Sequence, residues 1–196
     1  MTTRCGWVGS SPLMIAYHDR EWGVPVHRDR THFEFLVLDA FQAGLSWAIV
    51  LNKRESFRAA FDDFDPEKIA RYRAPKLARL LKDPGIIRNR QKVAAAVTNA
   101  RAFLDLVERE GSFDSFVWGF VDGVPQRNAW KRTGQVPPRS PISDRLSQAL
   151  KAQGFTFVGS TICYAYMQAA GLINDHLMDC FRYRQVGRRA ARARAS

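Results

Sequence analysis

Two cysteines and two histidines stand near opposite ends of this 196-residue chain and carry the side chains of a zinc site. Cys5 and His18 lie near the start, and His176 and Cys180 near the finish. Because His176 and Cys180 are four residues apart, a helix would place them on one face, as half of a tetrahedral set. The alternative is a chance placement of buried thiols and satisfied imidazoles, since long-range ligand spacing is less diagnostic than a compact Cys-x-x-Cys pair.

The N-terminal third is rich in aromatic side chains with polar tips, interspersed with carboxylates. A pocket for a nucleobase turned out of a duplex needs such a set, because rings cover the faces of the base and polar groups bind its edge. The alternative is that the rings form core, with carboxylates satisfying the indole N–H groups. Composition does not decide between these readings. The residues are Trp7, Tyr17, Trp22 and Trp47, with Asp19, Glu21, Asp39 and Gln42.

A basic hairpin is predicted in the middle of the chain. Residues 77–82 have a helical pattern, residues 83–85 form an Asp-Pro-Gly turn, and residues 86–92 lead into a long helix. Backbone N–H groups at such a helix start, with Gly85, Arg88, Arg90 and Lys92 beside them, suit a phosphate backbone. The alternative is an ordinary helical hairpin with a charged exposed face.

The formal charge of +11 favours DNA contact for this hairpin, because a basic surface attracts polyanions. Four arginines belong to residues 187–194, where we expect a disordered basic arm, and the rest of the chain stays basic without them. There is no long uncharged apolar run and no signal-peptide core, so we expect no membrane segment and a cytoplasmic location. Three cysteines argue against a disulfide framework, and Cys163 lies in an apolar stretch typical of core.

The elements that would position these groups are helices. Between residues 88 and 108, Val93, Val97, Ala100, Leu104 and Val107 recur at steps of four and three, which predicts one apolar stripe on a long helix. Shorter stripes occur at residues 33–40, 146–150 and 162–173, and alternating strand-like runs are scarce. The sequence therefore predicts an all-α fold.

A series of short motifs, in the same order along the chain, resembles those of a known family. From about residue 4 to residue 180 the chain resembles the DNA-3-methyladenine glycosylase I (Tag) family. The motifs that carry the likeness are Arg4-Cys5-Gly6-Trp7, Tyr17-His18-Asp19, Glu21-Trp22-Gly23-Val24-Pro25, Gln42-Ala43-Gly44-Leu45-Ser46-Trp47, Gly85-Ile86-Ile87-Arg88, Phe157-Val158-Gly159-Ser160-Thr161-Ile162-Cys163-Tyr164 and Asn174-Asp175-His176.

The resemblance implies a helix-hairpin-helix glycosylase fold. Residues 1–186 would form one helical domain of two lobes that share a base pocket, and residues 187–196 a basic tail. The likeness also implies one zinc ion per chain on Cys5, His18, His176 and Cys180. Four protein ligands leave no position for water, so the ion would be structural.

The activity that the resemblance implies is base-excision repair of alkylated double-stranded DNA by a monofunctional glycosylase, and we expect a monomer. Trp47 would stack on the extruded base, Tyr17 would line the pocket, and Asp39 would bind the adenine edge. Gln42, Gly44 and Leu45 would lie near the gap in the duplex. The base pocket would be completed by Trp7, Met14 and Trp22.

Two residues depart from the family pattern at this pocket. Asp39 stands where the family has glutamate, and Met14 where a second aromatic residue is expected. The shorter reach of Asp39 predicts a shifted or broader base preference. A second hypothesis is that the Asp39 and Met14 changes have abolished catalysis and left a DNA-binding protein. A metal-dependent hydrolase is the third reading, and a closed Cys2His2 site disfavours it.

Overall fold

The computed structural model describes residues 2–192, with side chains described as far as residue 186. The predicted all-α class is confirmed, since helices dominate the described residues. The elements in chain order are η1 (Gly6–Val8), α1 (Pro12–Arg20), α2 (Asp29–Gln42), α3 (Trp47–Asn52), α4 (Arg54–Ala60), η2 (Asp62–Phe64), α5 (Pro66–Ala70), α6 (Ala74–Leu80), α7 (Arg90–Glu110), α8 (Phe113–Trp118), η3 (Gly119–Val121), β1 (Gln126–Arg127), η4 (Thr133–Gln135), α9 (Pro141–Ala152), α10 (Ser160–Ala169), β2 (Ile173–Asn174) and α11 (Phe181–Arg192), where η marks a 3-10 helix.

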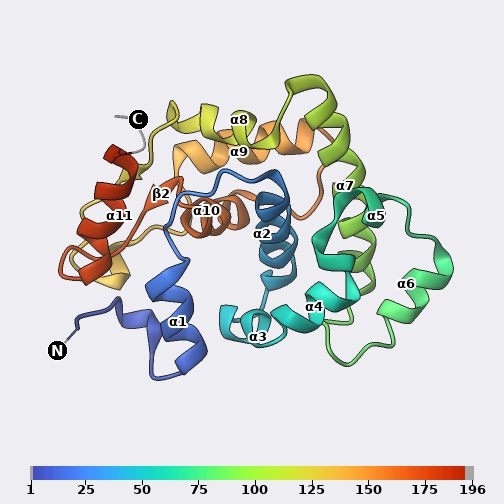
Figure 1. Cartoon of the computed structure of the whole chain (residues 1–196), viewed down its shortest axis with the longest axis horizontal. Helices are drawn as coiled ribbons and strands as arrows, with labels where there is room; N and C mark the ends of the chain where they lie inside the picture. The colour runs from blue at the N-terminus through green and yellow to red at the C-terminus, as the bar shows by residue number, and fades with distance from the viewer. Residues whose placement is uncertain (1, 193–196) are drawn as a thin grey trace.

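Helix α2 runs through the middle of the molecule, beside α10 and between α1 and the group formed by α4, α5 and α7 (Figure 1). Its predicted stripe of Phe33, Leu36, Val37 and Ala40 is buried, and so are Phe35, Leu38 and Asp39 between them. Since the helix is covered on several sides, the carboxyl group of Asp39 is carried into the interior with it.

Helix α7 is the long helix that the periodicity predicts, and its boundary and face differ slightly from expectation. It begins at Arg90 because the Asn89 side chain accepts a hydrogen bond from the Lys92 N–H and caps the helix there. Val93, Val97 and Ala100 are buried as predicted, whereas Leu104 and Val107 are only half-buried. The last turns bury Phe103 and Leu106 instead.

The predicted helical stripe through Ile173 is wrong at its end. Helix α10 stops at Ala169, and Gly171 has a φ of 75°, with space for no side chain: an added Cβ would lie 2.4 Å from the Val24 carbonyl carbon. Ile173 and Asn174 form β2 instead, paired in parallel with β1. This short pairing holds residues 174–180 against the loop that follows β1.

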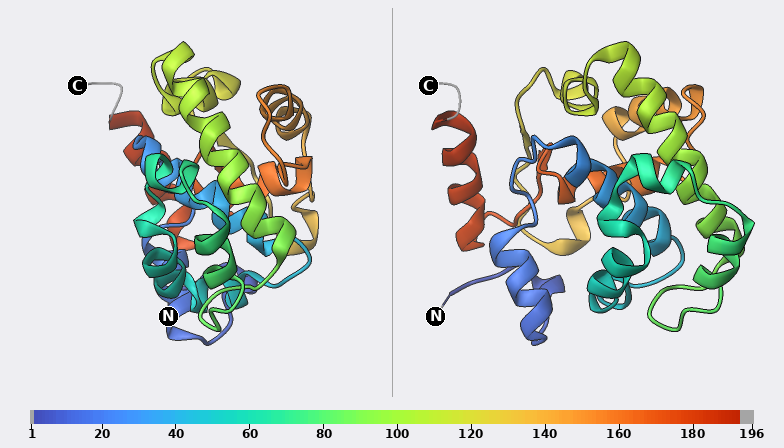
Figure 2. Two further views of the ribbon diagram at one scale, coloured as in Figure 1. Left: turned by 90° about the vertical axis from the view of Figure 1, so that its right-hand side faces the viewer. Right: turned by 45° about the vertical axis from the view of Figure 1, so that its right-hand side comes forward.

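The two ends of the chain lie side by side. Helices α1 and α11 occupy the same side of the molecule (Figures 1 and 2). The Phe181 N–H donates to the Thr3 carbonyl oxygen at 3.1 Å. Helix α11 continues to Arg192, so the expected disordered tail is helical over residues 187–192, and residues 193–196 lie outside the described part of the chain. Within the described residues, every helix is too short or too polar to cross a membrane.

Candidate active site and metal cluster

The four predicted ligands converge at one buried point between the ends of the chain. Their ligand atoms all lie within 4.8 Å of one another. The Cys180 Sγ atom is 3.5 Å from His18 Nε2 and 3.6 Å from His176 Nδ1, and the Cys5 Sγ atom is 3.6 Å from His176 Nδ1. Zinc bonds of about 2.0 Å to nitrogen and 2.3 Å to sulfur separate tetrahedral ligands by about 3.3 to 3.8 Å, so the cluster fits that ion.

One detail of the predicted cluster is wrong. His176 and Cys180 do not share a helix face, because residues 175–180 form a loop that follows β2. A turn brings the two side chains together, with the Cys180 N–H donating to the Leu177 carbonyl oxygen at 2.9 Å. The short β pairing, rather than helical spacing, therefore sets the position of His176.

The groups around the cluster orient its ligands. The His18 Nδ1 atom lies 2.8 Å from a carboxylate oxygen of Asp19, which Arg4 also binds, and His176 Nε2 lies 3.0 Å from the Trp22 carbonyl oxygen. Each imidazole can therefore donate its outer N–H and present its inner nitrogen to a metal. The hydrogen bond between the two thiols lowers the pKa of Cys180, and together with burial it raises the pKa of Cys5.

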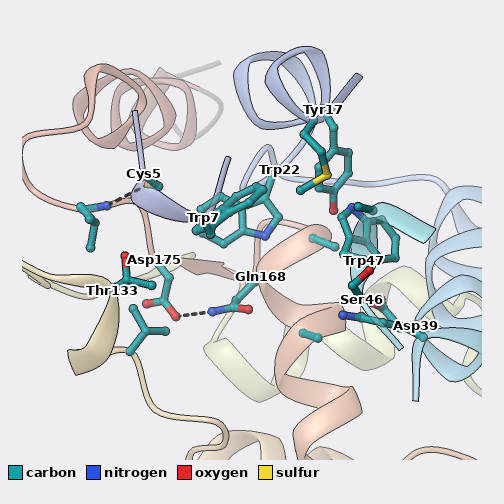
Figure 3. A pocket seen from close by; sticks show the side chains of 17 residues that line it. Cys5, Trp7, Tyr17, Trp22, Asp39, Ser46, Trp47, Thr133, Gln168 and Asp175 are labelled. Carbon is teal, nitrogen blue, oxygen red and sulfur yellow. Dashed lines mark hydrogen bonds between the residues drawn. The ribbon is translucent and has the colours of Figure 1, made fainter. Parts of the chain in front are cut away.

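A cavity of about 560 Å³ lies next to the cluster. Figure 3 shows Trp7 and Trp22 at its centre, Tyr17, Trp47 and Asp39 toward one side, and Asp175 and Thr133 toward the other. Its volume is in the range of small-ligand pockets, and its wall is mainly aromatic and apolar with few polar groups. The residues predicted for the base pocket are brought together here: Trp7, Met14, Tyr17, Trp22, Asp39, Gln42 and Trp47.

The carboxyl group of Asp39 is buried in this cavity with one oxygen that lacks a hydrogen-bond donor. Its side chain is 1% exposed, and its Oδ2 atom has no hydrogen-bond partner among the described residues. Burial raises the pKa of this carboxyl group well above its usual value, and the nearby charge of Arg54 opposes that rise. Trp47 Nε1 is a second buried polar atom without a partner in the described chain. A carboxyl group and an indole N–H are thus available to a bound molecule.

Aromatic contacts line both parts of the cavity, and one set of them reaches the Cys/His cluster. The rings of Tyr17 and Trp47 lie 5.2 Å apart, and burial followed by the charge of Asp39 raises the pKa of the Tyr17 hydroxyl. Trp7 contacts Trp22 edge-on at 4.9 Å, and Trp22 contacts the ring of the ligand His176 at 4.6 Å. One wall of the cavity therefore packs directly against the cluster.

Asp175 lines the cavity, and although it belongs to one of the family motifs, the sequence analysis assigned it no role. Its carboxylate accepts four hydrogen bonds, from Asn128, Trp130, Tyr164 and Gln168, at 2.6 to 2.7 Å. These donors come from the loop after β1 and from α10, so only the folded chain brings them together. The backbone of the neighbouring His176 is held separately, by its N–H donating to Asn174 Oδ1 at 3.2 Å.

The segment predicted to lie at the duplex gap forms a tight turn at the cavity. Gln42 lines the cavity, and the Leu45 N–H donates to the Gln42 carbonyl oxygen at 2.6 Å. Ala43 has φ and ψ of −46° and 115°, and Gly44 has a φ of 80°, which is a type II turn with glycine at its left-handed position. The turn leaves the Leu45 side chain 39% exposed.

The predicted basic hairpin is present between α6 and α7, with two differences. The Gly85 N–H is taken up by the Asp83 side chain at 2.7 Å, so this amide is engaged within the turn. Arg88 and Arg90 are exposed as expected. Lys92 is not, because its ammonium group points into the protein and binds backbone carbonyl oxygens, which corrects its assignment as a phosphate contact.

Comparison with known proteins accounts for this combination of fold, cluster and cavity. The methyladenine glycosylase family model matches residues 7–183. The chain belongs to the methyladenine glycosylase family. DNA-3-methyladenine glycosylase 1 of Escherichia coli (strain K12) is 49% identical over 180 residues, which cover 92% of this chain and 96% of that protein.

Solved structures of the same family have the same fold. A crystal structure of 3-methyladenine DNA glycosylase I (TAG) has a TM-score of 0.90 at 51% identity, covering 91% of this chain and 98% of the other. A variant of such an enzyme in complex with 3-methyladenine has a TM-score of 0.88 at 34% identity, covering 91% and 96%. Asp39 and Met14, the two residues that we expect to depart from the family pattern, both lie in the cavity wall.

Proposed function

We propose that this protein is a monofunctional DNA glycosylase of base-excision repair that extrudes and excises 3-methyladenine or a closely related alkylated purine. The observation that carries the proposal is the pair of unpartnered buried polar atoms, Asp39 Oδ2 and Trp47 Nε1, in an aromatic cavity. Relatives that cover nearly the whole chain are named for this activity.

The chemistry requires positioning more than a strong acid. A purine methylated at N3 carries a positive charge, which is neutralised when the base leaves with the electron pair of the glycosidic bond. A water oxygen then bonds to the sugar C1′ atom and releases a proton. Trp47 would stack on the base, Asp39 would bind its edge, and the Tyr17 hydroxyl would complete the wall. The cavity wall favours a cationic base through the negative faces of its rings.

A lyase reaction has no support in the cavity. Such a reaction needs an amine to form a Schiff base with the sugar, and the residues that line the cavity in the described chain include no lysine. Lys92 is engaged elsewhere with carbonyl oxygens. Base release without strand cleavage is therefore the expected outcome.

We further propose that Cys5, His18, His176 and Cys180 hold one Zn²⁺ ion per chain. Such an ion would supply structural cross-linking of the two ends of the chain, because four protein ligands complete its coordination. These residues tie the start of the chain to the loop after β2 and, through Trp22, support the cavity. Metal analysis of the purified protein should give about one zinc per chain.

The DNA surface that fits this cavity lies at its rim and at the basic hairpin. The turn at residues 42–45 would enter the gap that the extruded base leaves, and Arg88 and Arg90, on a helix-hairpin-helix element with Gly85, would bind phosphates. We place the protein in the cytoplasm and expect it to act as a monomer.

The experiment that tests the function is release of free base from duplex DNA carrying defined methylated purines, with Asp39→Asn and Trp47→Ala beside the wild type. We expect wild-type release of 3-methyladenine and a large loss in both variants. The changes at Asp39 and Met14 favour a second candidate, a binding protein without catalysis. Tight binding of abasic duplex with no base release from any of the substrates would select that candidate.

A further inference from the structure

We propose that Lys92 is a positioning residue that fixes the turn at residues 42–45 and thereby controls base extrusion, without contacting DNA. The inference rests on the proposed glycosylase function. It assigns a role to a charge that the sequence alone places among the DNA contacts.

The contacts of Lys92 connect two elements that are distant in the sequence. Its Nζ atom donates to the Phe41 carbonyl oxygen at 2.8 Å and to the Ala43 carbonyl oxygen at 2.6 Å. The side chain is only 7% exposed. These two carbonyl groups flank Gln42, which lines the cavity, so one ammonium group fixes the backbone on both sides of a cavity residue.

The turn at residues 42–45 needs such a partner because it follows the end of a helix. The last carbonyl groups of α2 have no partners within the helix, and its last turn contains no basic residue. A cation near a helix C-terminus is favourable for both reasons. The fixed type II turn then presents Leu45 outward at the cavity rim.

The position of Lys92 on α7 is unfavourable for a charged side chain, and its hydrogen bonds to the turn compensate for this. A positive charge in the first turn of a helix is opposed by the helix dipole, and burial lowers the pKa of this ammonium group. Two short hydrogen bonds to carbonyl oxygens compensate for both. On the other side of the hairpin, Lys53 Nζ donates to the Pro84 carbonyl oxygen at 2.8 Å. Lys92 thus joins α7 to the turn at the cavity rim, and Lys53 joins the hairpin to the junction of α3 and α4.

A double-mutant cycle tests the coupling. Base release from methylated duplex DNA is measured at saturating enzyme for Lys92→Met, Leu45→Ala and the double variant, with Arg90→Met, an exposed cation two residues away, as the matched control. We expect Lys92→Met to lower the maximal rate about tenfold or more, since small misplacements of a positioning group have effects of this size. Arg90→Met should instead weaken binding, because Arg90 is a proposed phosphate contact. In the Leu45→Ala background the same change should cost about twofold or less, because its target is already lost.

Salt dependence separates positioning from phosphate contact. Arg90→Met should reduce the slope of log affinity against log salt by about one, whereas Lys92→Met should leave it unchanged. Multiplicative losses in the cycle, or a slope change in Lys92→Met equal to that of Arg90→Met, would overturn the proposal. If Lys92→Met does not fold, Lys92→Gln replaces it in the same cycle. Failure of the wild type to release base would count against the glycosylase function itself, before the cycle is measured.

Discussion

The metal cluster and the cavity beside it are both buried, but their polar atoms are satisfied to different degrees. In the cluster, both nitrogens of His18 and of His176 face a partner, and the Cys5 sulfur accepts the Leu177 N–H. In the cavity, Asp39 Oδ2 and Trp47 Nε1 have none among the described residues. An unsatisfied buried polar group costs about 1 to 3 kcal/mol.

This difference separates a structural site from a reactive one. The cluster has a complete set of four possible ligands within the chain, whereas the cavity keeps two groups whose partners must come from outside. Trp22 joins the two, because its ring contacts both Trp7 in the cavity wall and the ligand His176. Changes in the cluster should therefore affect stability first, and changes in the cavity should affect activity first.

The largest expected effect is loss of the metal. Cys180→Ala should lower the melting temperature by on the order of 10 °C or more, because metal binding contributes directly to folding free energy. Thermal melting with and without a strong chelator measures this. Cys163→Ala, a buried cysteine outside the cluster, should remain as sensitive to the chelator as the wild type. Identical melting of the wild type with and without metal would contradict the structural role.

The second effect concerns the two unpaired atoms. Trp47→Phe keeps a stacking ring but removes the Nε1 donor, and Trp47→Ala removes both. Stacking contributes about 1 to 3 kcal/mol per base, so Trp47→Ala should lose about tenfold more base release than Trp47→Phe. Single-turnover rates on one methylated duplex provide the comparison. Equal losses in the two variants would mean that the ring does not stack on the base.

Asp39→Asn should lower the activity of the protein and raise its stability. Losing a hydrogen-bonding match to the base edge should raise the barrier to base release by about 1 to 3 kcal/mol, or about five- to 150-fold in rate. The variant should melt higher than the wild type at neutral pH, because it buries no ionisable group. A variant that is both inactive and less stable would show that Asp39 supports the fold.

The stability gain of Asp39→Asn should depend on pH. Burial raises the pKa of Asp39, so the folded protein keeps this proton after the unfolded chain has lost it. The wild type is therefore progressively destabilised as the pH rises from about 4, the unfolded pKa, to the folded pKa. Denaturant unfolding from pH 4 to 8 should show the advantage of the variant growing over this window. A constant difference would refute the raised pKa.

The smallest effect is expected at the exposed hairpin. Arg88→Ala should weaken binding to undamaged duplex and reduce the salt slope by about one, with little change in the rate at saturating enzyme. Affinity measured at several salt concentrations tests this. An unchanged slope would place Arg88 outside the DNA interface.

Much of the helical framework could be predicted, because periodicity reports burial directly. The stripes of α2 and of the first half of α7 are buried as the pattern predicts. Element ends were less accurate, because local contacts decide them: Asn89 starts α7, and the crowded backbone at Gly171 ends the α10 segment.

The candidate site was predictable in its membership and less so in its roles. The aromatic and carboxyl residues of the cavity could be listed because their types are unusual in one short stretch. Asp175 could not, since its function as an acceptor depends on donors from residues 128, 130, 164 and 168. Lys92 was misassigned because a sequence shows the charge of a residue but not its burial.

The most direct test of the account is the product formed from duplex DNA that carries a single 3-methyladenine. The unmodified protein, with its metal content measured, is incubated in excess over the DNA, and free base and strand breaks are quantified together. We expect stoichiometric release of 3-methyladenine with the abasic strand left intact. No release above the uncatalysed background from folded, metal-loaded protein would contradict it.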